Sequence, residues 1–208
     1  MTAIAILDYG MGNLRSVEKA LEHVDVRAEI TDDHEQARAA DGVILPGVGA
    51  FPRAMEEIRR RGLDELISER VAAGVPVLGI CLGLQLIFDS STELGGAEGL
   101  GLVSGPVDEL DAGELKVPHI GWSPVSWAKG SRLTEGLADD EPFYFVHAFA
   151  PRPEDDAAVL GTAEYGRRFV CAIERGNVFG AQFHPEKSSG AGLRLLRNFA
   201  SICASVPA

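Results

Sequence analysis

Short apolar segments alternate with helical patterns through the first half of the chain, and this alternation limits the possible folds most strongly. Residues 3–7, 26–30, 42–45 and 75–80 form the apolar runs, and Leu14, Val17 and Leu21 recur at helical spacing between the first two. A strand that is apolar on both sides must be buried on both faces. We therefore predict an α/β fold with a mostly parallel central sheet and helices on both of its faces.

The second half predicts an additional antiparallel portion. Four strand-like runs, at 123–127, 143–149, 157–165 and 169–174, follow one another with little helical pattern between them, and 177–183 is a last strand. We expect a helix over 82–88, loops around a short strand in 95–113, and a C-terminal helix capped by Ser188 or Ser189. With 208 residues and no linker, residues 1–208 are expected to form a single domain.

Composition excludes several classes of function. The chain has 31 acidic and 19 basic residues, a net charge of −12, so nonspecific binding to nucleic acid or anionic membranes is disfavoured. No apolar stretch approaches the roughly 18 residues of a membrane span, and no signal peptide is evident, so we expect a cytoplasmic protein. The three cysteines form no CxxC or Cys/His pattern, so we expect neither a metal nor a cofactor.

The sequence Gly79-Ile80-Cys81-Leu82-Gly83 carries the clearest chemical signal. It places a cysteine between two glycines where an apolar strand turns into a helix, which is the arrangement of a nucleophile elbow. The start of the following helix favours a thiolate there. Cys171 and Cys203 lack this context and are interpreted as packing residues.

A cysteine nucleophile needs a base and a group that orients the base. His184-Pro185-Glu186 directly follows the last predicted strand, so His184 can face Cys81 while Glu186 holds its imidazole. Taken alone, the triplet is equally compatible with a turn that caps a helix. His23 and His34 lie in charged helical stretches and are expected to be solvated.

Several motifs together resemble a known family. Residues 79–85 (GICLGLQ) and 183–187 (FHPEK) resemble class I, or triad, glutamine amidotransferases, whose fold is flavodoxin-like. Residues 8–14 (DYGMGNL), 45–51 (LPGVGAF), 118–122 (PHIGW) and 144–147 (YFVH) resemble the glutaminase subunit of imidazole glycerol phosphate synthase. These blocks span residues 8–188, nearly the whole chain.

The resemblance implies that glutamine is hydrolysed to glutamate and ammonia. Cys81 would attack the amide, and His184, oriented by Glu186, would act as acid and base. The amides of Leu82 and Val48 would bind the oxyanion. The ammonia would pass to a (β/α)8 cyclase subunit, the partner in a heterodimer that forms imidazole glycerol phosphate and aminoimidazole carboxamide ribonucleotide in histidine biosynthesis.

The same resemblance assigns two further sets of residues. It implies substrate contacts for Gly49, Gln85 and His147, and partner contacts for Lys187, Tyr144, Trp122 and Asn13. The chain departs from the family pattern at Ala148 and Phe149, where a hydroxyl residue and Tyr are common, and at Ser123, where Asn is usual. At residues 148 and 149, contacts would have to come from backbone groups or from elsewhere.

Two alternatives remain at this point. One is a glutaminase of the same class that serves anthranilate, guanylate or pyridoxal phosphate synthesis. The other is a nonenzymatic member of the wider cysteine-elbow group. The blocks at 45–51 and 118–122 and Lys187 argue against the first, and the intact His184-Pro185-Glu186 argues against the second, because a binding module needs no general base.

The elbow yields a first prediction. Cys81→Ala or Cys81→Ser should abolish glutamine hydrolysis and leave the fold intact, because the thiolate carries the covalent step. Cys171→Ala and Cys203→Ala should keep most of the activity. A glutaminase assay measures both, and hydrolysis that survives without Cys81 would refute the mechanism.

Overall fold

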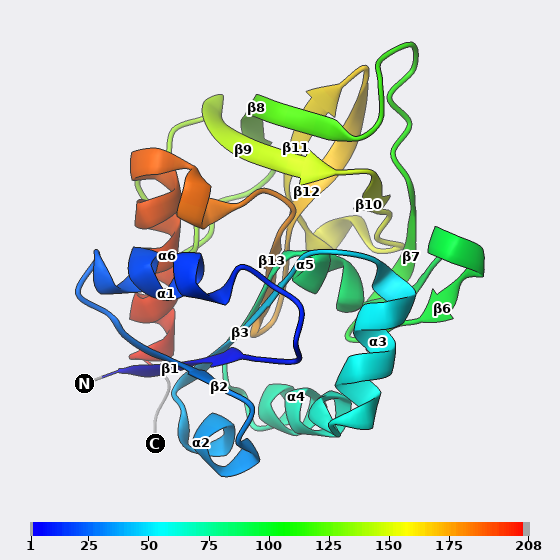
Figure 1. The fold of residues 1–208 in the computed structure, drawn as a ribbon. Coiled ribbons are helices and arrows are strands. Elements are labelled where there is room, and N and C mark those ends of the chain that lie inside the picture. The colour runs from blue at the N-terminus through cyan, green and yellow to red at the C-terminus, as the bar shows by residue number, and fades with distance from the viewer. Residues whose placement is uncertain (1, 206–208) are drawn as a thin grey trace.

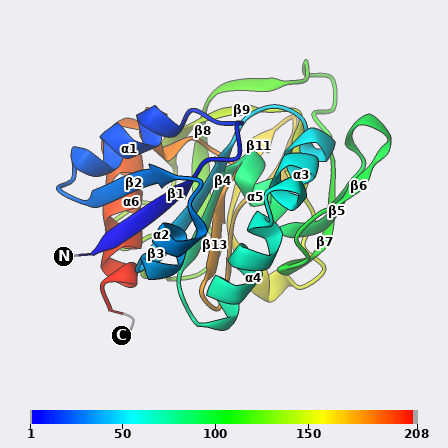
Figure 2. The same ribbon diagram turned by 60° about the horizontal axis from the view of Figure 1, so that its bottom comes forward.

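A computed structural model describes residues 2–205 and shows one large mixed sheet with helices on both faces (Figures 1 and 2). Its parallel part consists of β2 (Arg27–Thr31), β1 (Ala3–Leu7), β3 (Gly42–Gly47), β4 (Val77–Cys81) and β13 (Val178–Ala181), in that spatial order. The sheet continues antiparallel through β12 (Arg167–Arg175), β11 (Val159–Tyr165), β8 (His119–Trp127) and β9 (Glu141–His147). Both halves of the predicted architecture are confirmed.

The alternation of side chains along each strand divides the core between two faces. Ile4 and Ile6 of β1 pack with α1 (Leu14–Glu22) and α6 (Ser189–Cys203), whereas Ala5 and Leu7 pack with α2 (His34–Ala39), α3 (Phe51–Arg60) and α4 (Leu63–Ala72). Figure 2 shows these two helical layers on either side of the sheet. Burial on both faces explains why the parallel strands are continuously apolar.

A second, four-stranded sheet was not predicted. It consists of β10 (Phe149–Pro151), β7 (Val103–Glu109), β5 (Phe88–Ser91) and β6 (Ala97–Glu98). The predicted end of the helix over 82–88 is wrong. The helix α5 (Leu82–Leu86) ends earlier, because Phe88 joins β5 and is buried against Val103 and Val107. Three short 3-10 helices, η1 (Glu93–Gly95), η2 (Asp156–Ala158) and η3 (Pro185–Lys187), complete the fold.

Ser188 stands at the predicted N-cap position of α6, but its hydroxyl does not cap the helix. It donates to the His184 carbonyl at 2.6 Å and accepts from the Tyr144 amide at 3.0 Å. Ser188 therefore ties the segment after β13 to β9. Within residues 2–205, no helix combines the length and apolar character needed to cross a bilayer.

The turn from β4 into α5 is the tightest packing near the centre of the sheet. A Cβ on Gly83 would lie 1.7 Å from the Leu45 carbonyl oxygen, and a Cβ on Gly79 would lie 2.5 Å from the Gly83 carbonyl oxygen. No side chain fits at either position, so α5 rests directly on β3. This contact sets where the residue at the turn, Cys81, lies relative to the loop that follows β3.

Gly83→Ala should destabilise the fold by about 3 kcal/mol or more, because backbone has to move to admit the methyl group. Urea unfolding of the variant measures this loss. Gly130→Ala is the matched control, since a Cβ there meets nothing within 4 Å. A Gly83→Ala protein as stable as the control would contradict the packing described.

Candidate active site

The carboxyl ends of the parallel strands bring together motifs that are far apart in the sequence. In sheets of this kind, ligands bind outside those strand ends. A cavity of about 280 Å3 opens there, and eight of the predicted functional residues line it. They are Val48, Gly49, Cys81, Leu82, Gln85, His147, His184 and Lys187.

Cys81 occupies the strained elbow that the two glycines predict. Its φ of 55° and ψ of −110° are unusual for a residue with a side chain, and α5 begins at the next residue. The side chain is buried but faces the cavity. Its sulfur lies 3.7 Å from the Val146 carbonyl oxygen and accepts from Gln182 Nε2 at 3.8 Å.

His184 and Glu186, predicted as the base and its orienting group, form a buried pair. The Nδ1 atom of His184 lies 2.8 Å from Glu186 Oε1, and both side chains are almost completely buried. Burial opposes the imidazolium, but hydrogen bonds and charge interactions with the Cys81 sulfur and the Glu186 carboxylate outweigh it and raise the pKa of His184 to about 9. Near neutral pH, His184 therefore holds a proton beside the sulfur. Glu186 lies behind His184 and does not line the cavity.

The loop after β3 passes beside Cys81 and is held at both ends. Buried Tyr9 donates its hydroxyl to the Pro46 carbonyl at 2.7 Å, and the Phe51 amide donates to Glu93 Oε2 at 2.8 Å. Between these two contacts, Val48 is 43% exposed and Gly49 has a φ of 110°. Residues 47–50 thus form a short segment whose two ends are held by hydrogen bonds.

His147 belongs to a buried hydrogen-bonded chain. Because the Phe149 carbonyl can only accept, His147 Nδ1 donates to it, at 2.9 Å. In the neutral ring, His147 Nε2 then accepts from His119 Nδ1 at 3.2 Å, and His119 Nε2 accepts from the Ser123 hydroxyl at 3.0 Å. Ser123, one of the departures from the family pattern, thus completes a chain in which every ring nitrogen has a partner.

Sequence reasoning missed two residues of this site. Glu93 supplies a carboxylate to the cavity, but it lies in a Gly-rich segment with no recognisable signal. Gln182 is fully buried between Cys81 and Gln85; a polar residue inside the apolar run 178–183 was the available signal. Ala148 and Phe149 line the cavity, and the Phe149 carbonyl accepts from both His147 and Gln85.

Three of the four residues predicted to contact a partner lie close together. Trp122 and Tyr144 oppose each other on β8 and β9 with ring centroids 5.8 Å apart, and Lys187 Nζ lies 5.8 Å from the Tyr144 centroid. Asn13 is exposed just before α1. Cys171 and Cys203 are buried, as predicted, and burial raises the pKa of Cys203 to about 12.

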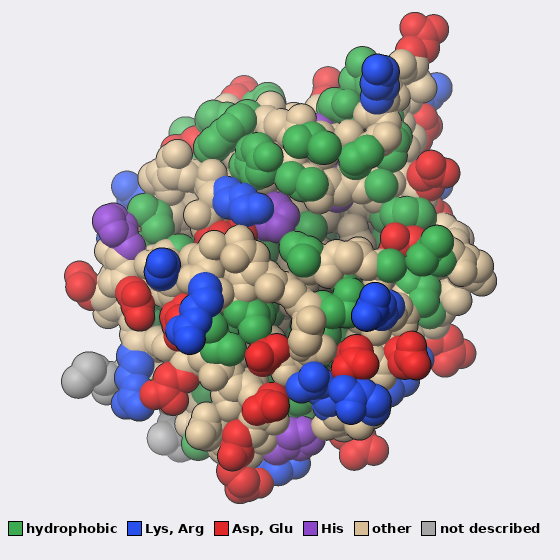
Figure 3. Space-filling model, viewed as in Figure 1, with side chains coloured by type: hydrophobic (Ala, Val, Ile, Leu, Met, Phe, Trp, Pro, Cys, Tyr) green, Lys and Arg blue, Asp and Glu red, His purple; other side chains and the backbone are tan. Residues whose placement is uncertain are grey.

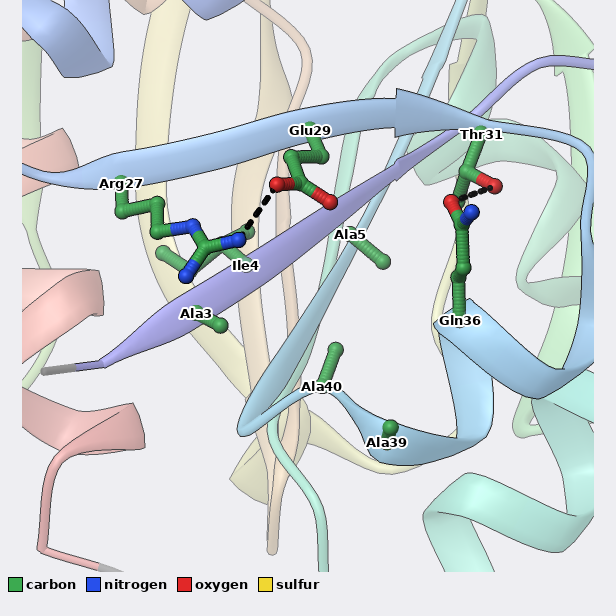
Figure 4. Close-up of a pocket in the computed structure, with 9 residues that line it drawn as sticks. All are labelled: Ala3, Ile4, Ala5, Arg27, Glu29, Thr31, Gln36, Ala39 and Ala40. Atoms are coloured by element: carbon green, nitrogen blue, oxygen red, sulfur yellow. Dashed lines mark hydrogen bonds and ion pairs between the residues drawn. The ribbon is translucent and has the colours of Figure 1, made fainter.

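A second hollow lies between β1, β2 and α2 (Figure 4). Alanine side chains form much of its wall, and its polar groups pair with one another: Arg27 with Glu29 and Thr31 with Gln36. It contains neither a thiol nor an imidazole. The residues needed for covalent chemistry are gathered only in the cavity at Cys81, among the described residues.

The chain matches the family "Glutamine amidotransferase class-I" over residues 5–203. It is 51% identical to imidazole glycerol phosphate synthase subunit HisH of Moorella thermoacetica, covering 97% of this chain and 96% of that one. The subunit of the same name from Rhodopirellula baltica is 52% identical, over 95% of this chain and 97% of that one. A glutamine amidotransferase of known crystal structure superposes with a TM-score of 0.76, at 21% identity, over 97% of this chain and 98% of that one. This similarity shows a shared fold.

The buried histidine chain predicts a specific pH dependence of stability. Burial lowers the pKa values of His119 and His147 from 6.5 to about 4. The unfolded chain therefore binds more protons between these values, and their contribution to stability is present above pH 6.5 and lost as pH falls towards 4. The free energy of unfolding should decrease as the pH is lowered from 6.5 to 4, and it should decrease less steeply in His119→Gln than in the unmodified protein. An equal slope in that variant would contradict the assignment.

Proposed function

The chain belongs to the class I glutamine amidotransferases and, among them, to the imidazole glycerol phosphate synthase subunit HisH family; on this basis we propose that Cys81, His184 and Glu186 carry out its glutamine hydrolysis. The resemblance predicted from the motifs is confirmed. The observation that carries the residue assignment is the 2.8 Å contact between His184 and Glu186 beside a cavity-facing cysteine at a strained elbow.

Each residue has a defined task in the reaction. The Cys81 thiolate attacks the amide carbon of glutamine, and a C–S bond forms. His184 gives its proton to the nitrogen as the C–N bond breaks, so ammonia leaves and a thioester remains. His184 then removes a proton from water, whose oxygen attacks the thioester; the C–S bond breaks, glutamate is released and the Cys81 thiolate is restored. A His184 pKa of about 9 supplies the proton that the first step requires.

The cavity also offers groups to bind the substrate and the oxyanion. Leu82 and Val48 both line the cavity together with Cys81, and we assign their backbone amides to the oxyanion. Gln85 Nε2 is bonded to Phe149 and Gln182, so its carbonyl oxygen is the group left for substrate. The Glu93 carboxylate, which sequence reasoning missed, suits the α-ammonium group of glutamine.

The surface around the cavity fits a protein partner. Val48 lines the cavity, and exposed apolar side chains continue over residues 115–122 as Leu115, Val117, Ile120 and Trp122. Figure 3 shows hydrophobic side chains gathered on this face, over β8 and β9. Ammonia released here must be kept from water, where it becomes ammonium. We assign this face to the cyclase subunit, and a cyclase that copurifies with the chain would exclude the other glutaminases.

The catalytic pair predicts an order of effects. His184→Ala should be nearly as damaging to glutamine hydrolysis as loss of Cys81, because the acid and base are removed. Glu186→Gln should be milder, since only orientation is disturbed, although such a loss can reach about 10⁴-fold. Steady-state kinetics in the presence of the partner compare the two variants. A greater loss in Glu186→Gln than in His184→Ala would overturn the roles.

Lys187 tests the partner surface. Lys187→Glu should weaken the complex or separate hydrolysis from cyclisation, and leave the isolated subunit folded. An unmatched charge costs about 2–5 kcal/mol if it is buried in an interface and much less at a wet rim. Affinity for the cyclase and the ratio of glutamate to cyclised product are the measurements. Wild-type affinity together with a ratio still near one would show that Lys187 is only a surface charge.

A further inference from the structure

The structure assigns Gln182 a role that the triad leaves open: its side-chain amide donates a hydrogen bond to the Cys81 sulfur, fixes the position of that sulfur and favours the thiolate. This inference rests on the proposed function, because it takes Cys81 as the nucleophile. Gln182 is the residue directly after β13, which pairs with β4, so its side chain reaches the elbow from the neighbouring strand.

The orientation of the amide follows from the atoms around it. The Phe149 carbonyl can only accept, so the atom of Gln85 that faces it at 3.0 Å must be the nitrogen. The second hydrogen of that nitrogen points to Gln182 at 3.1 Å, and it requires an acceptor there, the Oε1 atom. The other end of the Gln182 amide, facing Cys81 Sγ at 3.8 Å, is therefore the NH2 group.

Burial gives this contact its effect. Gln182 has no exposed surface, and Cys81 is buried, so water does not compete for the sulfur from that side. A donor that hydrogen-bonds to the charged form of a group favours that form. Gln182 carries no proton in the reaction and needs none. Its contribution is a fixed dipole that is present before substrate arrives. It acts on the same sulfur that faces the protonated ring of His184.

The test is the pH profile of Cys81 alkylation by iodoacetamide, followed by peptide mass spectrometry on the full chain. Cys171 and Cys203 are internal references because both thiols are buried. In Gln182→Met, which keeps the side-chain length and removes the donor, the pH midpoint of alkylation should rise by about one unit or more. With the partner present, kcat should fall, and KM for glutamine should change little.

Further variants separate this role from a structural one. In Gln182→Glu, an oxygen replaces the NH2 group while Gln85 keeps its acceptor, and the midpoint should rise at least as far. Gln85→Met should shift it in the same direction but less, because the Gln182 amide stays but is free to turn. Gln36→Met is the matched control: it removes the hydrogen bond to Thr31 in the remote hollow of Figure 4, and the wild-type midpoint should remain.

The ionisable groups already near Cys81 are unchanged in Gln182→Met and Gln85→Met, so they do not account for a shift in these two variants; Gln182→Glu adds a carboxyl group beside the sulfur. The groups already present are His184, Glu186, Tyr9, His147, Glu93 and Lys187. A folded Gln182→Met or Gln182→Glu protein with the wild-type midpoint would overturn the inference and leave the triad intact. Wild-type Cys81 that reacts no faster than Cys171 and Cys203 would instead overturn the proposed function.

Discussion

The contact between the Gly83 backbone and the Leu45 carbonyl is the constraint on which the site depends. It brings the start of α5 directly against β3, and β3 pairs with β4 up to the register pair Gly47 and Cys81. Cys81 and the loop after β3 are therefore neighbours through backbone geometry alone. Because the sheet itself brings these two segments together, the candidate site lies at the carboxyl ends of the parallel strands. Side-chain contacts then fix its details.

Three histidines show how the surroundings of one residue type divide its functions. His184 keeps its proton because the Cys81 sulfur and the Glu186 carboxylate accept hydrogen bonds from its ring, whereas burial among aromatic rings and neutral donors holds His119 and His147 uncharged. The first is the residue to which we assign proton transfer, and the other two belong to the uncharged hydrogen-bonded chain. Groups whose pKa values are driven apart in one cavity are typical of acid–base sites.

Much of the fold and the core of the site could be predicted from the sequence, because the signals were local. The apolar runs specified the parallel strands, and the glycines around Cys81 specified the elbow. The second sheet was missed, since β5 and β7 pair across a Gly-rich segment, β5 has only four residues, and β7 contains a glycine and a proline. Gln182 and Glu93 were missed because their significance lies in contacts with residues distant in sequence, Cys81 and Phe51.

The two anchors of the loop after β3 have a mechanical consequence. Because the Pro46 carbonyl is bonded to Tyr9 and the Phe51 amide to Glu93, a change of conformation that keeps both hydrogen bonds is confined to the residues between them. Rotation of a peptide plane in this segment would leave β3 and α3 in place. Such a rotation involves only a few torsion angles, so its time scale is that of a loop motion rather than of a domain motion.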